Sequence, residues 1–132
     1  MAKETVLIVD DNPMNLKLER TLLEIEDYKV MTAKSAEDAL ETLKNFTPKL
    51  ILMDLQLPGI DGVELTRQLK NDPNYNHIRV LLVTSYGQMG DEKRAWEAGC
   101  DGYITKPIDT KTFPAAVANC LQNHTDGPSA GY

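Results

Sequence analysis

The acidic side chains most able to do chemistry in this chain follow runs of apolar residues. Asp54 comes directly after the apolar residues 50–53, a run with the length and bulk of a strand buried on both faces. Asp10 and Asp11 follow a second such run, residues 6–9. Open α/β sheets bind their ligands beyond the carboxyl ends of the strands. Three carboxylates at such ends, together with an ammonium group at another strand end, can form a site for a cation and a phosphate group.

Two further polar side chains end other apolar runs and complete this predicted site. Lys106 follows the short run 103–105, and Thr84 ends another run. Repulsion among three close carboxylates should raise the pKa of one of them unless a cation is bound. Mg²⁺ suits the site because it prefers oxygen ligands, such as carboxylates and a backbone carbonyl, here that of Gln56. Asp54 could then attack a phosphoryl group and form an acyl phosphate, with Lys106 and Thr84 receiving phosphoryl oxygens.

Strand and helix patterns alternate five times along the chain, and this alternation predicts how the site is assembled. The predicted strands cover residues 5–10, 28–33, 50–55, 78–84 and 103–105. Right-handed crossovers between them give an α/β fold, a doubly wound five-stranded parallel sheet with helices on both faces. The flavodoxin-like strand order 2-1-3-4-5 places the ends of the first and third strands side by side. That order would bring the three aspartates together.

The first predicted helix has a clear start and an apolar stripe. Asn12 is expected to be its N-cap, and Pro13 fits its first turn. Leu18, Leu22 and Ile25 recur at helical spacing, so we expect them to face the sheet.

The bulk properties exclude several classes of protein. A length of 132 residues fits one domain, expected over residues 1–124, with residues 125–132 as a disordered tail. The net charge of −6 argues against direct nucleic-acid binding. No secretory signal and no apolar stretch long enough for membrane insertion are present, so a cytoplasmic protein is expected. Cys100 and Cys120 are expected to be buried free thiols.

Taken together, the motifs resemble the receiver domain of two-component response regulators, over about residues 5–123. The matching segments are VDDN at 9–12, LMDLQLPGIDG at 52–62, VTS at 83–85 and GYITKP at 102–107. The tract 76–103 is similar to DivK-type single-domain regulators and to the receivers of hybrid kinases.

This resemblance implies roles for the candidate residues. Asp54 would accept a phosphoryl group from a phosphohistidine of a sensor histidine kinase or histidine phosphotransfer protein. Asp10 and Asp11 would help to hold Mg²⁺, with Asp11 the more direct ligand, and Thr84 and Lys106 would contact the phosphoryl group. The chain would then be a phosphoacceptor switch in phosphorelay signal transduction that catalyses only its own phosphorylation and dephosphorylation. It would bind a downstream protein target, as a monomer or a weak phosphorylation-dependent dimer.

The resemblance also suggests how the signal is read and how long it lasts. Movement of Thr84 toward the phosphoryl group would let Tyr103 turn inward. Trp96 and Tyr103 would belong to an output face formed by the fourth helix, the fifth strand and the fifth helix. Gln56 and Tyr86 occupy positions that line the path of the hydrolytic water in this family, and the bulk of Tyr86 is expected to slow loss of phosphate.

Two departures from the family pattern bear on geometry. Ser85 stands where alanine is more common, which keeps the position small. Pro114 falls inside the expected last helix, so that helix either begins late, near Thr112, or has an irregular first turn. The Lys106–Pro107 bond is one that can be cis, which would fix the turn carrying the ammonium group.

Three other interpretations remain open from the sequence. A Mg²⁺-dependent phosphohydrolase with an aspartate nucleophile usually has an acid two residues later, where this chain has Gln56. A binding module that never turns over phosphate would not need the full set of Asp, Thr and Lys. A receiver excised from a hybrid kinase would show the same motifs.

Overall fold

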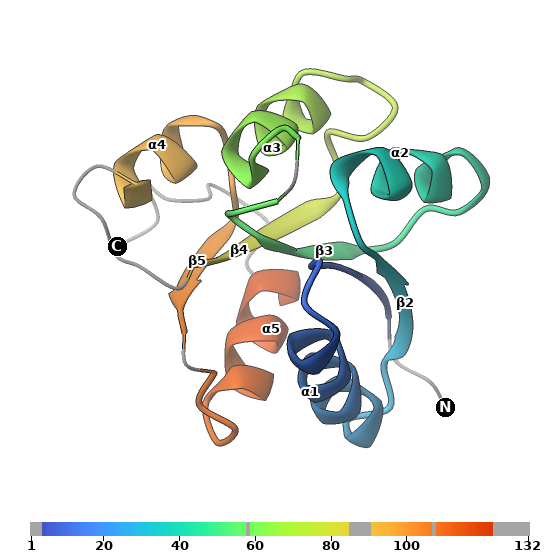
Figure 1. The fold of residues 1–132 in the computed structure, drawn as a ribbon, viewed down its shortest axis with the longest axis vertical. Helices are drawn as coiled ribbons and strands as arrows, with labels where there is room; N and C mark the ends of the chain where they lie inside the picture. The colour runs from blue at the N-terminus through green and yellow to red at the C-terminus, as the bar shows by residue number, and fades with distance from the viewer. Residues whose placement is uncertain (1–3, 58, 85–90, 107, 123–132) are drawn as a thin grey trace.

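The computed structural model describes residues 4–57, 59–84, 91–106 and 108–122, and the prediction of a tail over residues 125–132 falls outside them. Five strands and five helices alternate in the described ranges, as predicted (Figure 1). The strands are β1 (Thr5–Val9), β2 (Lys29–Ala33), β3 (Leu50–Asp54), β4 (Arg79–Thr84) and β5 (Gly102–Thr105). The helices are α1 (Pro13–Ile25), α2 (Ala36–Asn45), α3 (Gly62–Lys70), α4 (Asp91–Glu97) and α5 (Phe113–Gln122).

The strands form one parallel sheet in the order β2-β1-β3-β4-β5, which confirms the predicted doubly wound topology. β1 and β3 are neighbours at the point where the order reverses, and Val9 lies opposite Met53 in their register. Asp10 and Asp54 each come directly after this pair. The carboxyl ends of β1 and β3 therefore place both aspartates at the same edge of the sheet.

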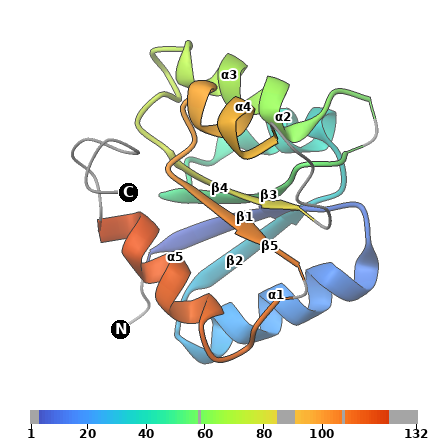
Figure 2. The same cartoon turned by 90° about the vertical axis from the view of Figure 1, so that its left-hand side faces the viewer.

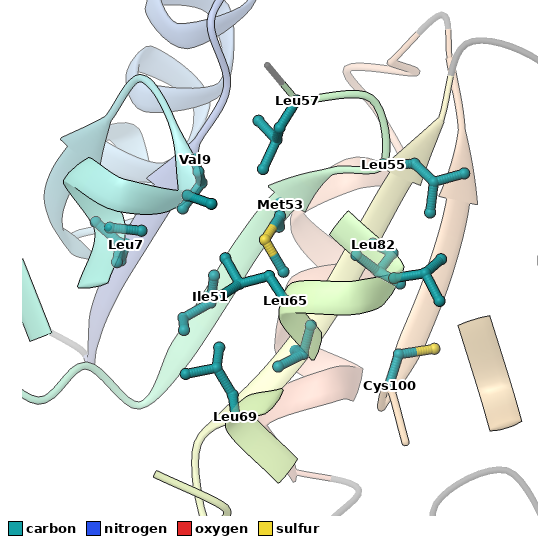
Figure 3. Packing of buried hydrophobic residues seen from close by; sticks show 14 of the residues in the cluster. Leu7, Val9, Ile51, Met53, Leu55, Leu57, Leu65, Leu69, Leu82 and Cys100 are labelled. Carbon is teal, nitrogen blue, oxygen red and sulfur yellow. The ribbon is translucent and has the colours of Figure 1, made fainter. Parts of the chain in front are cut away.

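Two apolar layers cover the two faces of the sheet (Figures 1 and 2). α1 and α5 lie on one face, and α2, α3 and α4 lie on the other. Alternate strand residues enter alternate layers, as Ile8 and Leu52 do on the α1–α5 side. Ile51 and Met53 enter the opposite layer, where Figure 3 shows them near Leu65 of α3.

Local signals at the helix starts behave as the sequence predicts. The side-chain oxygen of Asn12 accepts hydrogen bonds from the backbone amides of Met14, at 2.9 Å, and Asn15, at 3.2 Å. α5 begins at Phe113, so Pro114 falls in its first turn, where a missing N–H breaks no helical hydrogen bond. The late-start interpretation of the last helix is thus confirmed.

The predicted inward face of α1 is wrong for Leu18 and Ile25, whereas Leu22 packs against the α1–α5 layer as predicted. Leu18 is 38% exposed and Ile25 is 68% exposed, while Leu22 is only partly buried. The buried residues of the helix are Glu19 and Leu23. α1 carries apolar side chains at two overlapping helical spacings, and the stripe that faces the sheet contains a glutamate.

Two further expectations about bulk properties can be compared with the structure. Among the described residues, no helix is long and apolar enough to cross a membrane. Cys100 and Cys120 are buried free thiols, as predicted. Burial raises the pKa of each thiol to about 12, so neither is a ready nucleophile.

Candidate functional site

Three aspartates meet at the carboxyl edge of the sheet, as the predicted strand order requires. One carboxylate oxygen from each of Asp10, Asp11 and Asp54 lies within 4.8 Å of the others. Asp10 and Asp54 are buried, whereas Asp11 is exposed. The cluster therefore has a protein-facing side and a solvent-facing side.

Backbone amides fix one oxygen of each buried carboxylate. The Asn12 amide donates to Asp10 Oδ1 at 2.9 Å, and the Gln56 amide donates to Asp54 Oδ1 at 3.0 Å. Each aspartate thus accepts a hydrogen bond from the residue two positions later, a local turn that orients the carboxylate. The second oxygen of each carboxylate is left for another partner.

That partner is Lys106, which follows β5. Its Nζ lies 3.3 Å from Asp54 Oδ2 and 3.4 Å from Asp10 Oδ2. The Lys106 amide also donates to the Thr84 carbonyl at 2.7 Å, which continues the β4–β5 ladder and fixes where the side chain starts. Burial disfavours the ammonium, but Asp54 and Asp10 outweigh it and raise the pKa of Lys106. The site therefore contains a fixed positive charge shared by two carboxylates.

The pKa of Asp54 is raised, in the direction that the sequence predicts. Burial is the largest cause, and the charge of Asp10 adds to it. The Gln56 amide and the Lys106 ammonium act in the opposite direction. Repulsion between carboxylates, the cause expected from the sequence, is thus secondary to removal of the carboxylate from water.

Thr84 and Tyr103, the predicted switch pair, lie on neighbouring strands and on one face of the sheet. Thr84 is fully buried at the end of β4. Leu82, two residues earlier, is the register partner of Tyr103, so alternation places Thr84 on the same side as Tyr103. Tyr103 and Trp96 are partly buried and both pack against the core that lies under α2, α3 and α4.

A cavity of about 300 Å³ opens between α4, β5 and α5. Trp96 and Tyr103 line it together with Gly102 and Cys120. Figure 1 shows β5 at the edge of the sheet, between these two helices. The two residues predicted for the output face therefore share one concave surface.

Sequence reasoning missed Gly62, which holds the segment after Asp54 in place. The Gly62 amide donates to the Leu55 carbonyl at 2.7 Å. A Cβ atom at this position would lie 2.6 Å from the Asp54 carbonyl oxygen, so only glycine allows α3 to approach β3 this closely. A glycine at the first helical position, directly after the Asp61 cap, was the available signal.

Sequence reasoning also missed Glu19, which is buried in α1 with only 2% of its surface exposed. Burial raises its pKa to about 8, with Asp10 as the next cause. The signal in the sequence was a glutamate placed between Leu16 and Leu23 at helical spacing.

The structure does not test several of the predicted site features. Ser85, Tyr86 and Pro107 lie outside the described residues. The Gln56 side chain is exposed, and a metal-binding role for its carbonyl stays a prediction.

The donor set fits a hard divalent cation beside a phosphoryl group. Clustered carboxylate oxygens are ligands that Mg²⁺ prefers, and an adjacent ammonium suits a phosphoryl oxygen. The site lies at the switch point of a doubly wound sheet, which is where such sheets bind their ligands. Residues 6–118 match the response regulator receiver domain, and the chain belongs to that family. The resemblance predicted from the sequence is confirmed.

Individual relatives agree with this assignment. The chain is 41% identical over 118 residues to the polar-differentiation response regulator DivK of Brucella ovis, covering 89% of this chain and 96% of DivK. It is similar, at TM-score 0.85 and 28% identity, to a CheY-like response regulator receiver domain protein of Methanospirillum hungatei, covering 93% and 97% of the two chains. The signal receiver domain of a signal transduction histidine kinase from Syntrophus aciditrophicus gives TM-score 0.85 at 29% identity, covering 98% and 100%. This family consists of phosphoacceptor switches in two-component signalling rather than of conventional enzymes.

Proposed function

We propose that Asp54 accepts a phosphoryl group from a phosphohistidine of a sensor histidine kinase or histidine phosphotransfer protein. The observation that carries the proposal is the position of Lys106, whose ammonium lies 3.3 Å from Asp54 and 3.4 Å from Asp10. Burying a lysine even partly between two buried carboxylates costs free energy, and such clusters of charge are typical of functional sites.

Mg²⁺ is the cofactor that the carboxylates favour. The ion would be bound by the carboxylates of Asp10, Asp11 and Asp54 and by the backbone carbonyl of Gln56. Asp11 is exposed and would be the ligand closest to solvent. The bound ion would neutralise charge on the phosphoryl oxygens. Support comes from the mutual spacing of the three carboxylates and from their oxygen-only chemistry.

The transfer step needs only positioning and neutralisation from the protein. One oxygen of the Asp54 carboxylate forms a bond to phosphorus while the phosphorus–nitrogen bond of the donor breaks, and the imidazole keeps the electron pair of that bond. The Gln56 amide holds Asp54 in orientation through Oδ1. Lys106 and the Thr84 hydroxyl would each receive one phosphoryl oxygen.

The donor would dock on the exposed apolar stripe of α1. Met14 is 80% exposed, Leu18 38% and Ile25 68%, and helical geometry places all three within about 40° around the axis. α1 begins two residues after Asp11, so a protein that brings a phosphohistidine to Asp54 must cover the start of this helix. Its apolar stripe therefore suits the donor rather than the downstream target.

The downstream protein would bind where Trp96 and Tyr103 line the cavity between α4 and α5. Thr84 would move toward the new phosphoryl group, and Tyr103 would follow it inward on the same face of the sheet. This surface lies away from the donor stripe, so the two partners can bind in turn. The partners are proteins, and neither nucleic-acid binding nor membrane insertion is part of the proposal. Any dimer would be weak and would depend on phosphorylation.

The chain would catalyse only its own phosphorylation and dephosphorylation. A phosphohydrolase of the aspartate-nucleophile type would need an acid where Gln56 lies, and an amide cannot donate the proton. Gln56 and Tyr86 would instead set how long the phosphoryl group stays on Asp54.

Incubation with Mg²⁺ and acetyl phosphate, followed by intact-mass measurement, tests the proposal. One base-labile phosphoryl adduct is expected, and Asp54→Asn should form none. Asp11→Asn should form the adduct only at higher Mg²⁺ concentration. An adduct that persists in Asp54→Asn would refute the assignment of the acceptor.

A further inference from the structure

The cavity between α4, β5 and α5 has an aromatic and acidic wall. Trp96 and Tyr103 supply two aromatic rings, and Glu92 and Asp101 supply two carboxylates. Among the described residues that line the cavity, none is a lysine or an arginine. Its volume of about 300 Å³ is at the lower end of the range for ligand sites, about 300–1,000 Å³, so it suits one long side chain better than a larger ligand.

Asp101 belongs to this wall, but its charge is already balanced from outside the cavity. Its Oδ2 accepts hydrogen bonds from Lys70 Nζ at 2.8 Å and from the Val80 amide at 2.9 Å. A guanidinium nitrogen of Arg79 lies 3.8 Å from Asp101 Oδ1. The two cations compensate this carboxylate, so Asp101 is a fixed part of the wall rather than the group that attracts a ligand.

Glu92 is the carboxylate whose charge is not balanced in this way. It lies in the first turn of α4 and is exposed, and its Oε2 accepts a hydrogen bond from Trp96 Nε1 at 3.3 Å. Among the ion pairs formed by the described residues, none involves Glu92. Arg94 of the same helix pairs with Asp61. The cavity therefore has a negative charge at the edge of an indole ring.

Gly102 of β5 keeps one wall of the cavity free of a side chain. A Cβ atom at this position would lie 2.6 Å from Leu81 Cδ1 and 3.4 Å from Cys120 Sγ. Leu81 and Cys120 also line the cavity. A larger residue at position 102 would displace these neighbours or fill the space, so glycine preserves room for an occupant.

An aromatic ring beside a carboxylate favours a cation as the occupant. The faces of aromatic rings are negative, and the indole ring attracts cations most strongly. A guanidinium group is planar, so it can stack on a ring while it donates to a carboxylate, whereas an ammonium is a compact and strongly hydrated charge. The net charge of −6 adds a general attraction for a basic partner. These properties favour arginine, a residue enriched among the strongest contacts of protein interfaces.

We propose that the cavity receives an arginine side chain of the downstream protein, stacked on Trp96 and bound by the Glu92 carboxylate. This inference rests on the proposed function, which assigns the downstream protein to the surface of Trp96 and Tyr103. Inward movement of Tyr103 would change the wall of the cavity. The affinity for the arginine should therefore depend on whether Asp54 carries a phosphoryl group.

An NMR titration with Nα-acetyl-arginine amide tests the site. The signal to follow is the indole N–H of Trp96, the single tryptophan of the chain. Nα-acetyl-citrulline amide is the matched probe, because it has nearly the same shape without the charge. At constant ionic strength, the arginine probe should cause a saturable shift and bind at least about fivefold more tightly than the citrulline probe. Equal affinities, or no saturable shift with the arginine probe, would overturn the inference.

Two glutamates of α4 provide matched variants. Glu92→Gln removes the charge at the cavity and should weaken binding of the arginine probe about fivefold or more, with no effect on the citrulline probe. Glu97 is exposed on the same helix and is not among the residues that line the cavity. Glu97→Gln should therefore bind the arginine probe as the unaltered protein does. Equal weakening by both substitutions would indicate a general attraction to an acidic surface and would overturn the assignment.

Phosphorylation tests whether the site belongs to the downstream protein. The titration would be repeated with excess Mg²⁺ and acetyl phosphate, with Asp54→Asn in the same mixture as the control. The affinity of the unaltered protein for the arginine probe should rise about fivefold or more, and that of Asp54→Asn should stay constant. An affinity that does not respond to the adduct would separate the cavity from signal output and overturn the proposal. A Trp96 signal that shifts with protein concentration, without any probe, would assign the cavity to a second copy of this chain and also overturn it.

The outcomes separate this inference from the proposed function. If no adduct forms, the proposed function fails, and the titration of the unmodified protein still reports whether the cavity binds the arginine probe. If the adduct forms and the arginine probe binds no better than the citrulline probe, only the inference about the cavity is overturned.

Discussion

Replacing Glu19 by glutamine should change how the stability of the protein depends on pH. The pKa of Glu19 is raised by burial from its ordinary value of 4.5 to about 8. A carboxyl group with a higher pKa in the folded state takes up a proton on folding at any pH between these values. The native state then binds more protons than the unfolded state, so the free energy of unfolding falls as the pH rises from 4.5 to about 8. Glutamine cannot titrate and removes this dependence.

The expected magnitude follows from the two pKa values. The slope for one group is about 1.4 kcal/mol for each pH unit within the window. The slope decreases close to pH 8, so between about pH 5 and about pH 8 Glu19→Gln should gain about 3.5 kcal/mol relative to the unaltered protein. This is a large part of the total stability expected for a domain of this size. Any fixed difference in packing between the two side chains cancels, because only the change with pH is used.

Urea unfolding at about pH 5, 6.5 and 8, without divalent cations, measures the effect. Glu24→Gln is the matched control, since Glu24 lies on the same helix, is half exposed and forms an ion pair with Arg20 at the surface. Its stability should follow that of the unaltered protein at every pH. If the difference between Glu19→Gln and the unaltered protein is independent of pH, Glu19 titrates normally and the reasoning from its burial is refuted.

Four further substitutions test other parts of the structure. Gly62→Ala places a Cβ atom 2.6 Å from a backbone oxygen of β3, so it should lower the free energy of unfolding by about 1–3 kcal/mol and slow phosphoryl acceptance; unchanged urea midpoints would contradict the close approach. Leu18→Glu should slow transfer from a phosphohistidine donor but not from acetyl phosphate, and equal slowing of both would place the donor elsewhere. Thr84→Ala should leave the adduct intact while abolishing its effect on the fluorescence of Trp96; a retained fluorescence change would exclude the proposed relay. Tyr86→Ala should shorten the lifetime of the aspartyl phosphate, and an unchanged or longer lifetime would count against its shielding role.

Much of the site was predictable because it lies where regular elements end. Alternating strand and helix patterns determine the strand order, and the order determines which strand ends are neighbours. The proximity of Asp10 and Asp54 was therefore predictable from topology alone. The proximity of Lys106 was predictable from its position after the last strand. The same reasoning gave the Asn12 cap, whose side chain satisfies amides in its own sequence neighbourhood.

The inward face of α1 was not predictable from periodicity, for a physical reason. Leu18 and Ile25 fit helical spacing as well as Leu23 does, so the apolar pattern alone does not choose between two stripes. The structure places Glu19 on the buried stripe, where hydrophobicity would not put it.

Long-range pairs were missed for a related reason. Lys70 at the end of α3 donates to Asp101 at 2.8 Å, and the Asp101 carboxylate also accepts from the Val80 amide. These partners come from α3, from β4 and from the connection before β5, and they share no motif. Pairings of this kind depend on how helices sit on the sheet, which the sequence pattern does not specify.

The identity of the modified residue tests the central claim most directly. After incubation with Mg²⁺ and acetyl phosphate, borohydride reduces an aspartyl phosphate to homoserine, which peptide mass spectrometry can place in the sequence. We expect homoserine at position 54 alone, and none when Mg²⁺ is removed by a chelator. Homoserine at position 10 or 11, or an adduct that forms equally well without Mg²⁺, would contradict the assignment of Asp54 as the phosphoryl acceptor of a cation-dependent site.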